Sequence, residues 1–284
     1  MNNSLLNRLT PNVYWTQPDP DTDRPVLGVV AGKRALLLVD AGNSTAHAHQ
    51  VMSVLSEEGL RLPAYVVLTH WHWDHIFGGP AFDCPLIAYA ETGAQIEEMA
   101  GWSWSDAALD QRVQQGIEIP FCRDMMMKEL PDPRDRVLRP VDIHFSGQLD
   151  IDLGGVTARC LHVGGDHASD ASIVYIPEQR VAFLSDCLYP DIYARLPKYS
   201  PMTFFNLSVR LQGLGAEWYV MGHHDAPLSR DEFMRQINRM ELIGECVMMN
   251  GRDRAGTIAG LAAEGIESLD EFDIEFIENF EAGL

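Results

Sequence analysis

The chain has 284 residues, a formal net charge of −20 and 46% hydrophobic residues. This length fits one large domain, 1–284, with ample apolar residues for a core. The negative charge disfavours nucleic acid and anionic membrane as partners, and no stretch is long and apolar enough to span a membrane, so we expect a small-molecule substrate.

The first third of the chain predicts three buried strands. Residues 26–30 and 35–39 are apolar runs on either side of a short polar turn, which predicts a pair of strands. Residues 64–68 form a third apolar and partly β-branched run. Between the second and third runs, residues 46–58 predict a helix that ends at Gly59, with His47 and His49 expected on its exposed side.

Four side chains that bind metals follow the third strand directly: His70, His72, Asp74 and His75. Residues two apart in an extended stretch point to the same side, so His70 and His72 should face one centre. Neutral imidazole suits zinc, and a carboxylate adds charge neutralisation. The carboxyl ends of strands are where α/β proteins commonly place their sites. The run therefore predicts a metal site at this strand end.

Later strands repeat the arrangement. Each of three further strand-like regions leads into one more side chain of the same kind, namely His167 between residues 155–163 and 171–176, Asp186 after residues 180–185, and His223 after residues 217–221. This repetition is more specific than any single loop, and it predicts that the three side chains join the first four.

These motifs resemble those of the metallo-β-lactamase superfamily. His70, His72, Asp74 and His75 match its HxHxDH motif, and the loops around His167, Asp186 and His223 resemble its later ligand motifs. The resemblance runs from about residue 26 to residue 227. It implies an α/β fold, a four-layered αβ/βα sandwich, with a metal site where the two sheets meet at one edge.

The resemblance also implies a ligand assignment. By this match His70, His72 and His167 would hold one metal, Asp74, His75 and His223 would hold a second, and Asp186 would bridge them. Two Zn²⁺ ions are expected, with Mn²⁺ or Fe²⁺ as alternatives.

The aspartate at position 186 favours one branch of the superfamily. Glyoxalase II-like thioesterases and homoserine lactone lactonases resemble this chain there, whereas β-lactamase branches carry Cys or no carboxylate. Cys187 is adjacent, and we expect it to be a small buried apolar residue.

Tyr189 lies three residues after Asp186, as in the lactonases. A phenol there would face a developing oxyanion, and packing in the loop is the alternative role. Tyr193, Lys198 and Tyr199 belong to the same loop and could take the place of Tyr189.

The expected activity is hydrolysis of a lactone, ester or thioester, in which a bridging hydroxide attacks the carbonyl. Asp74 or Asp186 would carry the proton to the leaving group. Phosphoester or β-lactam hydrolysis on the same site is an alternative, because each reaction passes through an anionic oxygen. Two further hypotheses are a persulfide-dioxygenase-like enzyme with one iron and a non-catalytic metal-binding protein.

Two helical regions surround the expected sandwich. Residues 92–142 predict a helical insertion near the active site, and its Trp102, Trp104, Phe121 and Met125–Met127 offer an apolar wall for the substrate or pack the insertion itself. Residues 229–284 predict C-terminal helices beginning at an N-cap, Ser229, which would pack on the sandwich or form a homodimer.

The cysteines indicate the compartment. The five are odd in number and widely spaced, and residues 1–8 lack the apolar stretch of a signal peptide. We therefore expect reduced thiols and a cytoplasmic protein.

Overall fold

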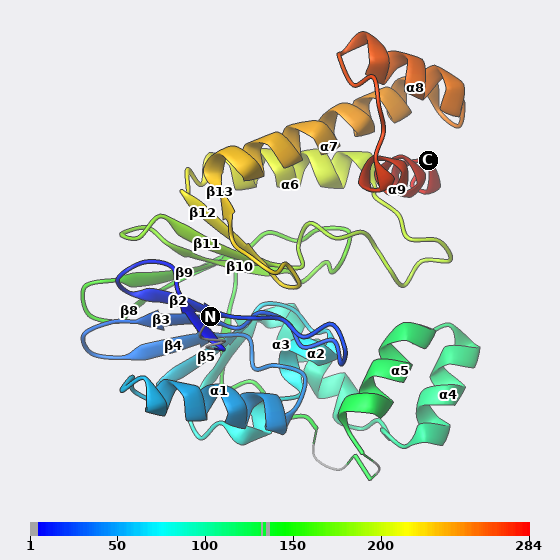
Figure 1. Ribbon diagram of the computed structural model, residues 1–284. Coiled ribbons are helices and arrows are strands. Elements are labelled where there is room, and N and C mark those ends of the chain that lie inside the picture. Colours follow the sequence, from blue (N-terminus) through cyan, green and yellow to red (C-terminus); the bar gives the residue numbers. More distant parts are fainter. Residues whose placement is uncertain (1–4, 132, 135–136) are drawn as a thin grey trace.

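The structure is a computed structural model that describes residues 5–131, 133–134 and 137–284. Two β-sheets lie face to face, and helices cover both outer faces (Figure 1). In the view of Figure 1, α1 and α3 lie below the sheets, while α6 and α7 lie above them. The four-layered αβ/βα sandwich predicted from the sequence is confirmed.

The first sheet has seven strands, and their order in the sheet is their order in the chain. Its pairs are antiparallel from β1 to β4 and parallel from β4 to β7. The strands are β1 (Leu6–Arg8), β2 (Val13–Thr16), β3 (Gly28–Ala31), β4 (Leu36–Val39), β5 (Tyr65–Leu68), β6 (Leu86–Tyr89) and β7 (Ile143–Phe145).

The second sheet has six strands in the order β13-β12-β11-β10-β9-β8. Only β11 and β12 pair in parallel, so their carboxyl ends meet at the same edge. The strands are β8 (Gln148–Asp152), β9 (Thr157–His162), β10 (Ser172–Ile176), β11 (Val181–Ser185), β12 (Trp218–Met221) and β13 (Leu228–Ser229).

Helices divide between the two sheets. Those that follow strands of the first sheet are α1 (Thr45–Glu57), the short α2 (Trp73–Ile76), the 3₁₀ turn η1 (Gly79–Ala81), α3 (Ala90–Met99), α4 (Asp106–Gln115) and α5 (Pro120–Glu129). Those that follow strands of the second are α6 (Pro201–Gly213), α7 (Arg230–Asn250), α8 (Arg254–Ala263) and α9 (Glu271–Ala282). None of these described helices is both long and apolar enough to cross a membrane.

Strands near the middle of each sheet are buried on both faces, which explains why their sequences are continuous apolar runs. On β4, Leu37 and Val39 face the space between the sheets, while Leu38 faces the helices. On β11, Phe183 likewise faces inward and Leu184 faces the opposite helices. Alternation along the strands thus produces three core layers.

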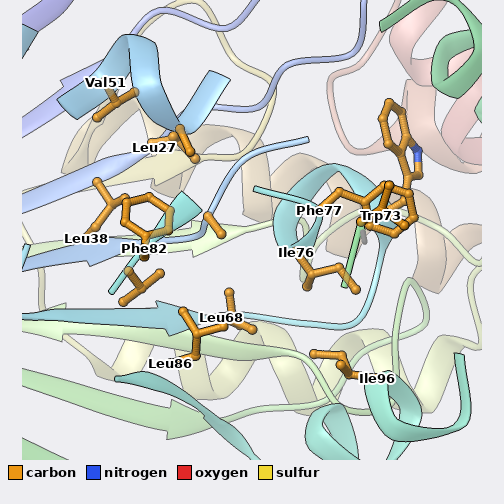
Figure 2. Close-up of a cluster of buried hydrophobic side chains, with 14 of the residues drawn as sticks. Leu27, Leu38, Val51, Leu68, Trp73, Ile76, Phe77, Phe82, Leu86 and Ile96 are labelled. Atoms are coloured by element: carbon orange, nitrogen blue, oxygen red, sulfur yellow. The ribbon is translucent and has the colours of Figure 1, made fainter. Parts of the chain in front are cut away.

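The outer core layer of the first sheet is drawn in Figure 2. Leu38, Leu68 and Leu86 project from neighbouring strands, and Val51 of α1 and Ile96 of α3 belong to the same buried cluster. Fully burying one such aliphatic side chain contributes about 1.5–3 kcal/mol. This packing fixes the strand ends from which the polar side chains of the next section emerge.

Several local predictions can be compared with the structure. The strands expected at residues 35–39, 64–68 and 180–185 are confirmed to within one residue at each end. The exposed position expected for His47 is wrong, since its ring is buried beneath the turn at Gly42, whereas His49 is exposed. Burial lowers the pKa of His47 to about 3.

Helices occupy both regions outside the sandwich core. In residues 92–142 these are most of α3, with α4 and α5, while positions 132, 135 and 136 lie outside the described residues. At the C-terminus, Ser229 caps α7 in a reciprocal arrangement with Glu232. Arg239 of α7 and Asp273 of α9 form two parallel hydrogen bonds of 2.5 Å, which tie the C-terminal helices together.

Candidate metal centre

All seven predicted ligand side chains emerge at one edge of the two sheets. His70 and His72 lie in the segment after β5, and Asp74 and His75 lie on the one-turn helix α2. The other three lie in the β9–β10 loop (His167) and directly or shortly after the ends of β11 (Asp186) and β12 (His223). The strand ends therefore bring together residues that are far apart in the chain.

The side chains form two groups, and the ligand atoms of each group lie within 4.8 Å of one another. One group is His70, His72 and His167, and the other is Asp74, His75, Asp186 and His223.

One carboxylate oxygen faces both groups. Asp186 Oδ2 lies 3.1 Å from His75 Nε2 and 3.3 Å from His223 Nε2, within its own group. The same oxygen lies 3.5 Å from His167 Nε2 and 3.8 Å from His70 Nε2, in the other group. Asp186 thus occupies the position that a bridging carboxylate needs.

Several polar atoms here are buried without a hydrogen-bond partner in the structure: Nε2 of His70, His72 and His167, and Oδ1 of Asp186. A buried polar atom without a partner costs roughly 1–3 kcal/mol, and four in one place call for a ligand. Imidazole nitrogens and a carboxylate oxygen are the donors that zinc and related divalent metals take. The residues present therefore fit a metal centre.

The protonation states of His70, His72 and Asp186 suit metal ligation. Burial, together with neighbouring imidazoles, lowers the pKa of His70 and of His72 well below the usual value, so both rings are neutral. Burial raises the pKa of Asp186, but the nearby His223 and His75 outweigh it and keep the carboxyl ionised. Neutral imidazoles and an ionised carboxylate are the forms that bind metals.

Asp40, which follows β4, orients His75 and was not recognised from the sequence. Asp40 Oδ2 lies 2.9 Å from His75 Nδ1, so this nitrogen donates and Nε2 is left to face the ligand group. The backbone N–H and the hydroxyl of Thr69 donate to Asp40 over 2.8 and 3.0 Å, and Ser185 Oγ lies 3.2 Å away. The one sequence feature that could have pointed to Asp40 is its place directly after an apolar strand.

Asp23 is a second residue that sequence reasoning missed. Its Oδ1 lies 3.6 Å from His223 Nδ1, and its backbone has the left-handed φ of 57°. Burial and the nearby Asp74 raise the pKa of Asp23 to about 7. A 2.7 Å ion pair between Arg24 and Glu129 ties this loop to α5. Nothing in the surrounding loop sequence distinguished Asp23 from its acidic neighbours.

A cavity of about 280 Å³ opens onto the ligands. Beside ligand residues it is lined by Tyr189, Phe121 and Cys122, among others. The insertion thus reaches the site through the start of α5. Of the two roles left open for Trp102, Trp104 and the Met125–Met127 run, the structure shows packing, because these residues belong to or pack against the core cluster beneath the first sheet.

The structure distinguishes among the tyrosines of the Asp186 loop. The ring of Tyr189 lies 5.8 Å from that of His167 and 6.2 Å from that of His223. The ring of Tyr193 also lies near a candidate ligand, 5.3 Å from that of His72, but its hydroxyl donates to Glu118 over 3.1 Å. The buried hydroxyl of Tyr199 donates to the Leu188 carbonyl over 2.9 Å. Only Tyr189 among these three lines the cavity.

Lys198 and Cys187, in the same loop, lie away from the ligand atoms. Lys198 Nζ is 3.9 Å from an Asp191 carboxylate oxygen and does not line the metal cavity. Cys187 is buried in the apolar cluster between the second sheet and its helices, as expected, and burial raises the pKa of its thiol.

Comparisons with solved structures agree with this fold. The chain resembles a metallo-β-lactamase from Pontibacter korlensis (16% identity, TM-score 0.59, covering 82% of this chain and 96% of that one). It also resembles a metallo-β-lactamase family protein from Thermus thermophilus (19%, 0.57, 91% and 95%). The sec-alkylsulfatase Pisa1 from Pseudomonas sp. matches over 99% of this chain but only 49% of its own (14%, 0.65).

At these identities the solved structures establish the fold alone. A search of the curated proteins finds no match. The model of the metallo-β-lactamase superfamily matches residues 23–223, which include all seven candidate ligands. The chain therefore belongs to the metallo-β-lactamase superfamily.

Proposed function

We propose that this protein is a dinuclear metal-dependent hydrolase of lactones, esters or thioesters. Members of the superfamily are mostly metal-dependent hydrolases. The observation that carries the proposal is the position of Asp186, whose Oδ2 lies within 4 Å of imidazole nitrogens from both ligand groups. In this assignment His70, His72 and His167 hold one metal, Asp74, His75 and His223 hold the other, and Asp186 bridges them.

Bound divalent metals supply an activated water at neutral pH and polarise a carbonyl oxygen. The chain's own residues supply position and proton transfer. Asp74 lines the cavity, and its Oδ2 lies 2.9 Å from His75 Nε2 and 3.2 Å from His223 Nε2, so it is the proposed carrier of the proton to the leaving group.

Tyr189 is the proposed donor to the oxyanion. Burial, with the negative charge of Asp186 nearby, raises the pKa of its phenol above the usual value, so the hydroxyl keeps its proton and can donate a hydrogen bond. A donor already in place where negative charge develops lowers the reaction barrier without reorganising.

The proposal also includes the cellular location of the protein and the identity of the metal. All five cysteines are free, and four of them are buried. This is consistent with the cytoplasmic location that we propose. Zinc is the proposed metal because the candidate ligands are histidines and aspartates alone, with the histidines in the majority, and zinc commonly takes such donors.

Hydrolysis by the wild type and two variants tests the proposal. The substrate panel contains a lactone, an ester, a thioester, a phosphoester, a β-lactam and a secondary sulfate ester, the last because of the likeness to an alkylsulfatase. Asp186→Asn should lose metal and nearly all hydrolysis, while the neighbouring Cys187→Ser should keep both. Full metal content and full activity in Asp186→Asn would refute the assignment.

A further inference from the structure

A second cavity, of about 710 Å³, lies beside the metal cavity. Residues 194–198 form one wall, and α9 forms another. The two cavities share Pro197. The two cavities therefore adjoin each other at this loop.

One face of α9 runs along both cavities. Glu275 lines the metal cavity, and Glu278, Asn279 and Ala282 line the second. The last three lie three, four and seven residues after Glu275, so all four are on the same side of the helix. At 1.5 Å per residue, the face from Glu275 to Ala282 extends about 10 Å. A substrate arm of that length would reach from one cavity into the other.

Cationic side chains line the second cavity, although the chain as a whole has a formal net charge of −20. They are Arg195, Lys198 and Arg252. Within the described part of the chain, Arg195 and Arg252 form no ion pair within 4 Å, and Lys198 lies a loose 3.9 Å from Asp191.

The two acids of this cavity are partly compensated. Arg254 binds Glu278 at 3.0 Å and Glu281 at 2.6 Å, which offsets one of their two negative charges. Glu275 lies at the metal cavity instead, where bound cations would balance it. The second cavity therefore presents net positive charge to a ligand.

We propose that this cavity binds an anionic substituent, a carboxylate or a phosphate, on the substrate that is hydrolysed in the adjoining metal cavity. Guanidinium groups recognise both anions through paired hydrogen bonds. This inference rests on the proposed hydrolase function and narrows its substrate class to anionic esters, lactones or thioesters.

Two esters that differ in one charge test the inference. One is the mono-4-nitrophenyl ester of suberic acid, whose free carboxylate lies at the far end of the acyl chain. The other is 4-nitrophenyl octanoate, which has a methyl group there. The wild type should hydrolyse the suberyl ester with the higher kcat/KM, and added salt should reduce that preference because the cavity is open to solvent.

The variants remove the cations. In the double variant Arg195→Gln/Arg252→Gln, the ratio of suberyl to octanoyl kcat/KM should fall by up to about 25-fold, since each partly exposed charge pair contributes up to about fivefold. Lys33→Gln is the matched control, because Lys33 lies in the β3–β4 turn, outside both cavities. Its ratio should equal that of the wild type.

Titration of free suberate by calorimetry gives a readout that does not need hydrolysis. Weaker binding to the double variant than to the wild type, with Lys33→Gln unchanged, supports the cavity even if neither ester is cleaved, and then the proposed hydrolase function fails alone. If both esters are cleaved at the same ratio by every variant and suberate binds all of them equally, the inference is overturned while the hydrolase function stands.

Discussion

Asp40 fixes the ring of His75, because its Oδ2 accepts a hydrogen bond from Nδ1–H over 2.9 Å and leaves Nε2 facing Asp74 and Asp186. Asp40 is itself held by both the backbone and the hydroxyl of Thr69. Its backbone has a left-handed φ of 64°, a conformation in which Asn and Asp are the best tolerated side chains after Gly.

The first prediction follows from this contact. Asp40→Asn should keep the backbone but weaken metal binding about 10–100-fold, which is the usual effect of removing a partner of a ligating histidine. Zinc affinity is measured by competition with a chelator. Asp152→Asn, which changes an exposed carboxylate, is the control. Unchanged affinity in a folded Asp40→Asn would show that Asp40 does not orient the ligand.

The second prediction concerns Gly222, which precedes His223. A Cβ at this position would lie 1.9 Å from Asp186 Oδ1, so Gly222→Ala should displace the Asp186 carboxylate and reduce the metal content. Gly213→Ala is the control, because its Cβ would meet no atom within 4 Å. Elemental analysis of both variants tests this, and equal metal content in the two would contradict the bridging position of Asp186.

The third prediction separates the tyrosines. Tyr189→Phe should lower kcat roughly 100-fold, the effect of losing one oxyanion donor, with metal content unchanged. Tyr193→Phe should have little effect on kcat, because its hydroxyl donates to Glu118 rather than into the cavity. Steady-state kinetics on the best substrate of the panel decides between them. Equal rates for Tyr189→Phe and the wild type would show that Tyr189 only packs in the loop.

The fourth prediction concerns pH and stability. Burial raises the pKa of Asp170 from 3.8 to about 6, and among the described residues neither oxygen of its carboxyl group has a hydrogen-bond partner. A carboxyl whose pKa is higher in the folded state binds its proton more tightly there, so its contribution to stability falls as pH rises from about 4 to 6.

Asp170→Asn should remove this dependence. Above pH 6 the variant should gain up to about 3 kcal/mol in the free energy of unfolding relative to the wild type, and at pH 4 the two should be similar. Urea unfolding at a series of pH values measures the difference. A difference that does not vary with pH would mean that Asp170 has an ordinary pKa in the folded protein.

Much of the fold could be predicted because its strands are continuous apolar runs, and each candidate ligand follows one of them. Asp186 and His223 lie 37 positions apart in the numbering, yet the parallel pairing of β11 and β12 brings them to one edge. The repeated pattern of a strand followed by a ligand-type residue, together with the family resemblance, predicted that these side chains meet, although their role as ligands stays a prediction.

The supporting residues could not be predicted in the same way. Asp40 and Asp23 act through other side chains, and such contacts depend on loop conformations that a single sequence does not encode in any short pattern. The same limit applies to the insertion, where Trp102 and Trp104 pack around Arg112 instead of lining the site. Composition left both an apolar wall and packing of the insertion open, because the direction of each side chain depends on tertiary packing.

The measurement that tests the central claim most directly is the metal content of the purified, untagged protein by elemental mass spectrometry. The proposed dinuclear centre predicts about two zinc or manganese ions per chain. A single iron per chain would contradict it and favour the oxygenase hypothesis, and a chain that retains no metal would contradict the metal centre itself.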